Sequence, residues 1–219
     1  MSRAPVNSGG TPRGGRTSKR RLFGIDRSGP APDATQSGQP LNPWTIPNAI
    51  GYLRLALIPV FLIVAFSSDN GEDTLAAVLF AVIGWADYLD GFAARLTGQF
   101  SRLGALLDPV VDRLLVISGM VVCWHFVLLP RWAIVLVVAR ELLMLVLSRY
   151  ALSRGIELKI NWAGRVAVAP TMGAPFFAFL GVHWLALILL YVGLALALTA
   201  TALYVRRGAL ELRKVSSSA

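Results

Sequence analysis

Six long apolar stretches set the strongest limit on how this 219-residue chain can fold. A helix of about 20 apolar residues spans the roughly 30 Å of hydrocarbon in a bilayer. Charged residues make up 15% of the chain, whereas about 25% is usual in a soluble domain. The sequence therefore predicts an all-α, polytopic integral membrane protein with about six transmembrane helices, at roughly 48–67, 74–95, 104–128, 132–150, 163–182 and 184–205.

The distribution of Lys and Arg predicts the orientation of these helices. Residues 1–40 contain seven basic residues against two acidic ones, and the loops near 96–103 and 150–163 are also basic. The loop at 67–73, which falls on the other side, is acidic. Because Lys and Arg concentrate on the cytoplasmic side of membrane proteins, we expect both termini to be cytoplasmic. Anionic lipid head groups then account for the net charge of +9 without a nucleic-acid partner.

Composition divides the chain into three parts. Residues 1–40 are rich in Gly, Ser, Pro and Arg, and we interpret them as a disordered basic N-terminal tail. Residues 41–208 form the membrane domain, and residues 209–219 a short cytoplasmic C-terminal tail. The basic stretch is not followed by the apolar core that a signal peptide requires. The single cysteine, Cys123, excludes an intramolecular disulfide.

Four aspartates, Asp87, Asp90, Asp108 and Asp112, stand inside the second and third apolar stretches. A charged side chain at the centre of a membrane helix costs roughly 2.5–3.5 kcal/mol on insertion scales, so this cluster needs a counter-charge. Steps of three and four residues put the first pair on one helix face and the second pair on one face of the next helix. Two acidic faces joined by a tight connection predict a site for one or two divalent cations.

The same residues also allow a purely structural interpretation. Arg95 and Arg113 are available for ion pairs with any single aspartate, although two arginines cannot offset four acids. The small residues Gly91 and Ala94 lie beside the first aspartate pair, and Gly104 begins the second acidic face. Small residues favour close packing of membrane helices. They also leave room for a bulky ligand against the backbone, and both interpretations stay open.

The full pattern, Asp-x2-Asp-Gly-x2-Ala-Arg-x8-Gly-x3-Asp-x3-Asp, is similar to the signature of the CDP-alcohol phosphotransferase (CDP-alcohol phosphatidyltransferase) family. Every position of it is filled, by Asp87, Asp90, Gly91, Ala94, Arg95, Gly104, Asp108 and Asp112. The resemblance implies a six-helix membrane transferase of phospholipid biosynthesis, with its site open to the cytoplasm. Such an enzyme moves a phosphatidyl group from CDP-diacylglycerol to an alcohol and releases CMP.

The resemblance also assigns roles to these residues. It implies that the metal ligands are Asp87, Asp90, Asp108 and Asp112, and that Asp112 acts as general base on the acceptor hydroxyl. It implies that the nucleotide is bound by Asp90, Gly91, Ala94, Arg95 and Gly104. Since oxygen-only ligands favour Mg²⁺ or Mn²⁺ over zinc, we expect two such ions as the cofactor.

Further residues resemble the bacterial branch that contains phosphatidylglycerophosphate synthase and cardiolipin synthase. They include Ile46-Pro47-Asn48, Arg54 with Pro59, the run 101–109, and Arg140-Glu141 with Arg149. The chain departs from that branch at Gly51, where Thr or Ser is usual, and at Gly164-Arg165-Val166-Ala167, where Gly-Lys-x-Lys-Thr is common. The first acceptor that we expect is glycerol 3-phosphate, giving phosphatidylglycerophosphate. The alternatives are phosphatidylglycerol, giving cardiolipin, and another phosphorylated polyol.

Three arginines are candidates for binding a phosphate on the acceptor. Arg140 lies inside the fourth apolar stretch, where an unpaired cation is costly, and Arg149 lies at its cytoplasmic end. Neighbouring residues point in different directions from a helix, so we expect Glu141 not to pair with Arg140. An acceptor phosphate would supply the missing partner. We therefore predict that Arg140, Arg149 and Arg165 bind it.

A divalent-cation transporter is the alternative from another functional class. It predicts discontinuous helices in two matched halves, with carboxylates near the bilayer midplane. The acidic motif instead lies at a cytoplasmic helix end, and the sequence contains no visible half-repeat. We thus expect a multi-pass enzyme of the bacterial plasma membrane whose active site faces the cytoplasm. Its partners would be CDP-diacylglycerol, a small phosphorylated alcohol and membrane lipids, and a homodimer is left open.

Overall fold

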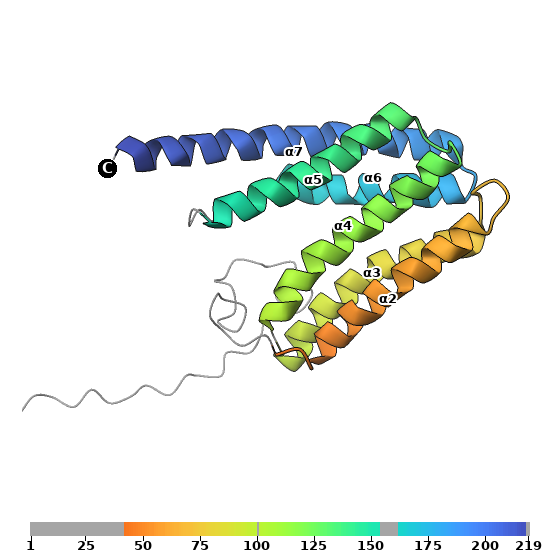
Figure 1. The fold of residues 1–219 in the computed structure, drawn as a ribbon, viewed down its shortest axis with the longest axis horizontal. Helices are drawn as coiled ribbons and strands as arrows, with labels where there is room; N and C mark the ends of the chain where they lie inside the picture. Colours follow the sequence, from red (N-terminus) through yellow and green to blue (C-terminus); the bar gives the residue numbers. More distant parts are fainter. Residues whose placement is uncertain (1–41, 100, 154–161, 218–219) are drawn as a thin grey trace, which may run out of the picture.

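The computed structural model describes residues 42–99, 101–153 and 162–217, which form six α-helices and no strand (Figure 1). The helices are α2 (Ile46–Phe66), α3 (Thr74–Thr97), α4 (Arg102–His125), α5 (Arg131–Ser153), α6 (Trp162–Phe179) and α7 (His183–Ser217). The all-α prediction is confirmed, and each predicted stretch overlaps one helix. Helix α7 includes most of the expected C-terminal tail. The expected disordered N-terminal tail, residues 1–40, lies outside the described residues.

Short polar side chains begin three of the helices. Thr45, Asp73 and Ser101 are the N-caps of α2, α3 and α4, and each accepts a hydrogen bond from the backbone N–H three residues on, at 3.3, 2.7 and 2.9 Å. Such caps satisfy backbone donors that a helix leaves unpaired. Helix α3 ends at Gly98, whose φ of +67° is a left-handed conformation that glycine adopts without strain. These residues produce the tight return from α3 to α4.

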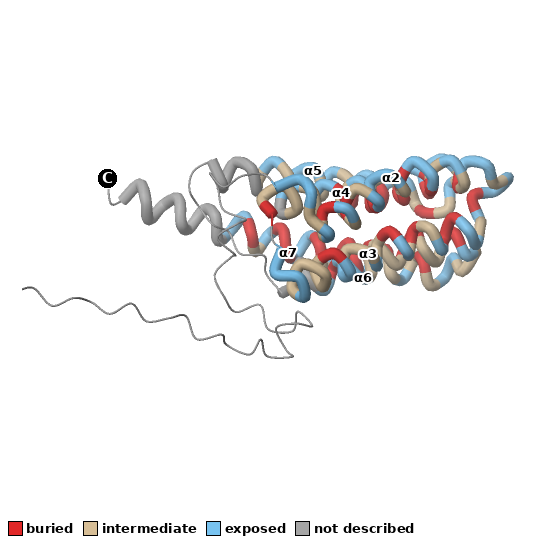
Figure 2. The backbone as a smooth tube through the Cα atoms, turned by 90° about the horizontal axis from the view of Figure 1, so that it is seen from below, coloured by how far each residue is buried: buried red, intermediate tan, exposed pale blue. Residues whose placement is uncertain are grey.

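Apolar residues of the six helices form one core along the inward faces of the bundle (Figure 2). It includes three phenylalanines from three helices, Phe61, Phe80 and Phe179, whose ring centroids lie 5.5–5.7 Å apart. Many large apolar side chains face outward instead, among them Leu53, Ile63 and Trp85. A bundle whose helices are apolar on both inner and outer faces suits a lipid environment.

Three of the helices are long and apolar enough to cross a membrane, as judged by length and composition over the described residues. They are Ile46–Phe66, Thr74–Thr97 and His183–Arg206. Helices α4 and α5 carry more charged residues, and α6 has a shorter apolar part, Val166–Phe179. The structure therefore supports the membrane class with three candidate spans.

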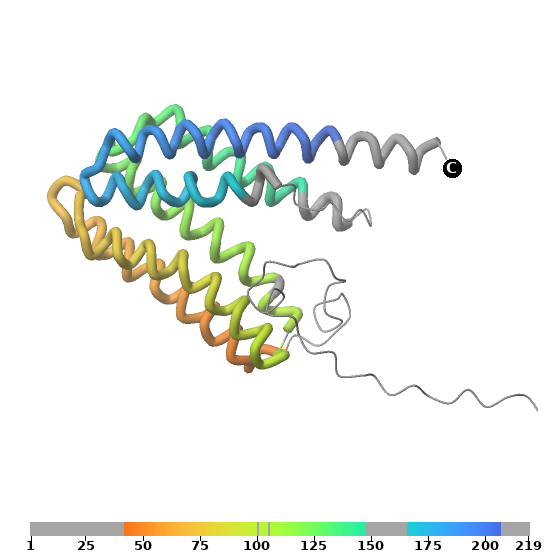
Figure 3. Tube along the Cα trace, turned by 180° about the vertical axis from the view of Figure 1, so that it is seen from behind, coloured from red at the N-terminus to blue at the C-terminus, as the bar shows by residue number. Residues whose placement is uncertain are grey.

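Four of the helices form two antiparallel pairs, α2–α3 and α6–α7, which meet through α3 and α6; α4 contacts both pairs, and α5 packs against α7 (Figures 1 and 3). Helix α2 packs against α3, α6 packs against α7, and α4 contacts α2, α3, α5 and α6. The two pairs lie close at the end that holds the connections 67–73 and 180–182, where Glu72 Oε1 lies 2.9 Å from His183 Nε2. They diverge toward the end that holds the start of α2 and the α3–α4 turn (Figures 1 and 3). The acidic motif lies on the α3 and α4 segments nearest this diverging end.

Candidate active site

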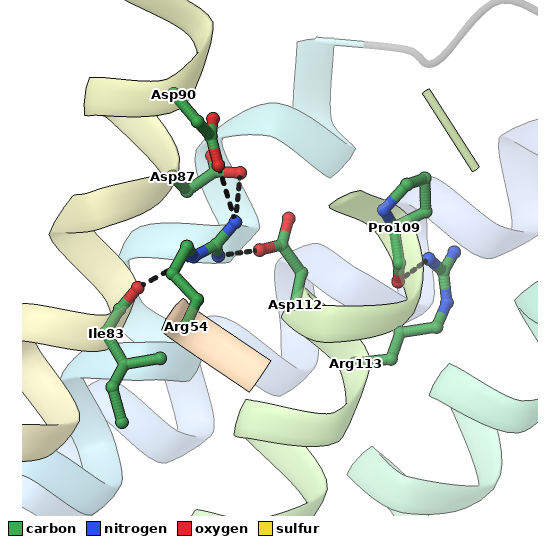
Figure 4. A network of polar contacts seen from close by, with 7 residues as sticks. All are labelled: Arg54, Ile83, Asp87, Asp90, Pro109, Asp112 and Arg113. Atoms are coloured by element: carbon green, nitrogen blue, oxygen red, sulfur yellow. Dashed lines mark hydrogen bonds and ion pairs between the residues drawn. The ribbon is translucent and has the colours of Figure 1, made fainter. Parts of the chain in front are cut away.

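A single buried guanidinium lies at the centre of the acidic motif (Figure 4). It belongs to Arg54 of α2, whose side chain is 1% exposed. Its Nε donates a hydrogen bond to the backbone oxygen of Ile83 at 3.0 Å. One terminal nitrogen donates to Asp87 Oδ1 and Asp90 Oδ2, both at 3.1 Å, and the other donates to Asp112 Oδ1 at 2.5 Å. Arg54 thus joins three carboxylates from two helices to a third helix.

The structure brings the aspartates together in the way that their spacing predicts. Asp87 and Asp90, one turn apart on α3, contact the same nitrogen of Arg54, and Asp112 reaches the guanidinium from α4. Asp108, one turn before Asp112, interacts electrostatically with Arg54 and with the other three aspartates. The tight α3–α4 turn makes this possible because it places the end of one acidic helix beside the start of the next.

The acidic cluster has a buried inner side and an accessible outer side. The Asp90 side chain is 5% exposed and lies beside Arg54, whereas those of Asp87 and Asp112 are 46% and 43% exposed. The three carboxylates direct one oxygen each toward the guanidinium (Figure 4). A ligand could therefore approach the cluster from the side opposite Arg54.

The donor set of this cluster consists only of carboxylate oxygens, which suits a hard cation such as Mg²⁺ or Mn²⁺. Within the described residues, no three acidic, His or Cys side chains are grouped as a preformed metal-binding set. The positive charge between the carboxylates comes from Arg54. The residue types fit a divalent cation, and their role as metal ligands stays a prediction.

Arg54, which contacts three of the aspartates, was not predicted from the sequence to belong to this site. Arg113, which was considered as a partner of the aspartates, donates instead to the backbone oxygen of Pro109 at 2.9 Å and turns away from Asp112 (Figure 4). The signal for Arg54 was present in the sequence, because it is the one charged residue of the 21-residue apolar segment Ile46–Phe66. An ionisable residue in such a segment is a functional candidate by default.

The two glycines of the motif have different surroundings. A Cβ atom added to Gly104 would lie 2.7 Å from Asn48 Oδ1 and 3.1 Å from Ser101 Oγ, which donates to that same Asn48 oxygen at 2.8 Å. A Cβ atom on Gly91 would meet only the flexible end of Arg95, at 3.4 Å. Close packing therefore requires a glycine at position 104, whereas position 91 has room beside its backbone.

The nucleotide-binding roles that the resemblance implies for Asp90, Gly91, Ala94, Arg95 and Gly104 stay predictions. Gly91, Ala94 and Arg95 are partly exposed near the end of α3, on the accessible half of the motif. Asp90 and Gly104 have protein partners in Arg54 and Asn48.

One premise about the acceptor-binding arginines is wrong. Arg140 was expected to lack a protein partner, but it donates one hydrogen bond to Glu141 Oε1 and another to Thr201 Oγ1, the latter at 3.2 Å. The long guanidinium side chain reaches the neighbouring carboxylate although the two residues leave the helix in different directions. Arg113 Nε also lies 3.8 Å from Glu141 Oε2, so two cations share one acid between α4 and α5. The side chains of Arg149 and Arg165 lie outside the described part of the chain.

Comparison with known proteins assigns this site to a family. The family model for CDP-alcohol phosphatidyltransferase matches residues 44–201. The CMP-forming cardiolipin synthase of Streptomyces coelicolor is 35% identical over 177 residues, covering 78% of this chain and 82% of the relative. A putative cardiolipin synthase of Mycobacterium tuberculosis is 37% identical over 124 residues, covering 56% of this chain and 58% of the relative. The CDP-diacylglycerol–glycerol-3-phosphate 3-phosphatidyltransferase of Escherichia coli is 33% identical over 138 residues, covering 60% of this chain and 74% of the relative.

The surroundings of the two glycines predict opposite effects of adding a methyl group. Gly104→Ala should lower the free energy of unfolding by about 1–3 kcal/mol, because the new Cβ displaces Asn48. Gly91→Ala should leave stability unchanged or raise it by up to about 1 kcal/mol, because alanine is the better helix former. Thermal unfolding of the purified protein in detergent measures both effects.

The Asn48→Ala background is the control for this comparison. With the Asn48 side chain removed, Gly104→Ala should lose most of its effect, since the two changes act on one contact. Equal losses from the two glycine variants, or a Gly104→Ala loss that persists in the Asn48→Ala background, would contradict the packing role of Gly104.

Proposed function

Because the chain belongs to the CDP-alcohol phosphatidyltransferase family, we propose that it transfers a phosphatidyl group from CDP-diacylglycerol to the hydroxyl of a glycerol phosphate. It is an enzyme of phospholipid biosynthesis, as the relatives are. The observation that carries the proposal is the convergence of the motif aspartates of α3 and α4 around one positive charge. The convergence brings the carboxylates of two acidic helix faces to one place, where they can bind divalent cations and, through these cations, a substrate.

The reaction exchanges one phosphate ester bond for another. The oxygen of the acceptor hydroxyl attacks the phosphorus that bears the diacylglycerol, and the bond from that phosphorus to the CMP oxygen breaks. CMP leaves with the electron pair, and the hydroxyl proton passes to a base. Asp112 is the proposed base, because its side chain is 43% exposed on the accessible side of the cluster.

The proposed cofactor is a pair of Mg²⁺ or Mn²⁺ ions held by Asp87, Asp90, Asp108 and Asp112. Bound cations of this kind stabilise the charge that develops on phosphate oxygens and make CMP a better leaving group. Gly91 has only the flexible end of Arg95 beside its Cβ position, so the nucleotide would approach the α3 backbone there if that side chain moves. Arg95, at the end of α3, would contact a phosphate of the substrate through charge-assisted hydrogen bonds.

The proposed topology has six membrane spans, with both termini and the active site on the cytoplasmic side. Three helices support it by length and composition. The motif lies toward the end of the bundle that holds Arg95 and Arg102 at the α3–α4 turn. The connection at the opposite end of α3 is acidic, with Asp69, Glu72 and Asp73. This asymmetry is the one that positive residues on the cytoplasmic side produce.

Phosphatidylglycerol is the acceptor that we favour. The match to a cardiolipin synthase covers 82% of that relative, which is more than the match to either glycerol 3-phosphate enzyme covers. The cluster of Arg113, Arg140 and Glu141 has one more cation than acids, so it can still attract the phosphate of a glycerol phosphate. In phosphatidylglycerol that phosphate is a diester with a single negative charge, which one excess cation balances.

Glycerol 3-phosphate, which the sequence analysis put first, is the second candidate. The relatives in Bacillus subtilis and Escherichia coli are named as enzymes that use it, at 28% and 33% identity. Both acceptors carry a glycerol phosphate, so the chemistry at the aspartates is the same for the two.

Replacing the motif aspartates should abolish CMP release. The sharpest variant is Asp108→Asn, because Asp108 makes no hydrogen bond to Arg54 among the described residues, so its loss leaves the ion pairs of Arg54 intact. We expect Asp87→Asn, Asp90→Asn and Asp112→Asn to lose activity as well. CMP release from CDP-diacylglycerol by purified protein measures the effect.

Asp73→Asn is the matched control, because it makes the same change at the other end of α3, where Asn caps a helix as well as Asp does. It should keep wild-type activity. If two or more of the motif variants kept over about a tenth of the wild-type rate, less than 1.4 kcal/mol of transition-state stabilisation would be lost, and the site assignment would be wrong.

Activity should depend on a divalent cation. We expect CMP release to stop in EDTA and to return with Mg²⁺ or Mn²⁺, because carboxylate oxygens bind these ions and the substrate pyrophosphate needs their charge. Calcium should bind without supporting turnover, because it relaxes the coordination geometry. Full activity in EDTA after metal-free purification would refute the two-cation mechanism.

An assay with two acceptors distinguishes the candidates. The enzyme is given CDP-diacylglycerol with either phosphatidylglycerol or glycerol 3-phosphate, and the lipid product is identified. We expect cardiolipin from the first and little phosphatidylglycerophosphate from the second, and the reverse result would establish the second candidate. Arg149→Ala and Arg165→Ala should raise the KM of the true acceptor about tenfold or more. Arg131→Ala, at the other end of α5, is the control and should leave both KM values unchanged.

A further inference from the structure

We propose that Arg54 is the built-in counter-charge of the acidic site. Its guanidinium holds Asp87, Asp90 and Asp112 together before a divalent cation binds, and it lowers the affinity of the site for that cation. The inference rests on the proposed function in one respect, namely that a divalent cation binds to these aspartates.

Hydrogen bonds hold the Arg54 guanidinium in one fixed position. All three guanidinium nitrogens are used, by the Ile83 backbone oxygen on one side and by three carboxylates on the others. The side chain is 1% exposed although it extends from the middle of an apolar helix. A planar guanidinium with several hydrogen bonds keeps one orientation, which a flexible lysine ammonium would not. Arg54 therefore sets where the α3 and α4 carboxylates lie relative to each other.

The charges explain why such a group is needed. Four aspartates on two adjacent helices repel one another, and two of them directly contact the same nitrogen of Arg54. Removing one member of a buried ion pair leaves an uncompensated charge and is strongly destabilising. Without Arg54, the α3–α4 contact at the motif would depend on a bound cation for its neutralisation.

The position of Arg54 indicates that it does not bind the substrate. It lies on the inner side of the carboxylates, while Asp87 and Asp112 are nearly half exposed on the outer side. A phosphate that approaches from the outer side meets the carboxylates, and any cations on them, before it could reach the guanidinium. Arg54 is accordingly a positioning residue.

The same contacts set a limit on cation affinity. A divalent cation held by these aspartates would be repelled by the guanidinium that contacts three of them. Arg54 thus stabilises the empty site and weakens its hold on the cation, so the site stays assembled without being permanently occupied.

The test is the variant Arg54→Met, which keeps most of the side-chain length and removes the charge. Mn²⁺ affinity, measured by electron paramagnetic resonance on the purified full-length protein in detergent, should increase about tenfold or more, because the repulsive cation is gone. In EDTA the melting temperature should fall by about 5 °C or more. Saturating Mn²⁺ should restore most of that loss, because the bound ion then supplies the missing charge.

Arg140→Met is the matched control. It also removes a partly buried arginine that pairs with a carboxylate in a helix, but outside the aspartate cluster. Its Mn²⁺ affinity should equal that of the wild type, and Mn²⁺ should raise its melting temperature no more than it raises that of the wild type.

Arg54→Lys gives a second measurement, which also serves if Arg54→Met does not fold. Lysine keeps the charge but cannot bond to three carboxylates and Ile83 in one fixed geometry. Its Mn²⁺ affinity should stay within about threefold of the wild type, because the repulsion remains. It should melt at a lower temperature than the wild type in EDTA.

Different failures point to different errors. If the wild type binds Mn²⁺ and Asp108→Asn weakens that binding, but Arg54→Met leaves it unchanged or weaker, Arg54 is not the counter-charge. A raised KM for CDP-diacylglycerol in Arg54→Lys with normal stability would make Arg54 a substrate ligand instead. If the wild type itself fails to bind Mn²⁺, the metal site of the proposed function is wrong, and this inference fails with it.

Discussion

The fold must accommodate four carboxylates, one of them buried, among apolar helices. Such charges are tolerated only where an opposite charge and hydrogen bonds compensate for lost hydration. Arg54 supplies both, since its guanidinium contacts three of the aspartates and a backbone oxygen. One residue on α2 therefore links α3 and α4 at the acidic motif.

A second contact, at the diverging end of the bundle, supports the same arrangement. The Asn48 side chain donates to the backbone oxygens of Asn42 and Pro43 and accepts from Ser101, which caps α4. Only a glycine at position 104 lets this amide approach so closely. The start of α2 is thereby attached to the start of α4, one turn before the first α4 aspartate. A signature glycine can thus serve packing, while its counterpart Gly91 meets only the flexible end of Arg95.

The sequence predicted the helices well, but it predicted the side-chain contacts between them less well. Long apolar stretches predict where the helices are but not how they pack, and steps of three and four residues predict which aspartates share a helix face. Neither signal says which other helix lies opposite, so Arg54, 33 residues before Asp87, was not identified as the counter-charge. The error at Arg140 has another origin. Helix periodicity describes where side chains begin, whereas Glu141 and Arg140 meet at the far ends of long side chains.

The residues proposed for the reaction and those proposed for the acceptor lie mainly on different helices. The aspartates and Arg54 lie on α2, α3 and α4, where ion pairs fix their geometry. The arginines proposed for the acceptor lie mainly on α5 and α6. Among the described residues α5 contacts neither α2 nor α3, whereas α6 packs against both α3 and α4. The two helix pairs are joined most closely at the opposite end, by the phenylalanine cluster and by the Glu72–His183 contact. We therefore expect substitutions on α5 near the diverging end to affect the choice of acceptor more than the positions of the carboxylates.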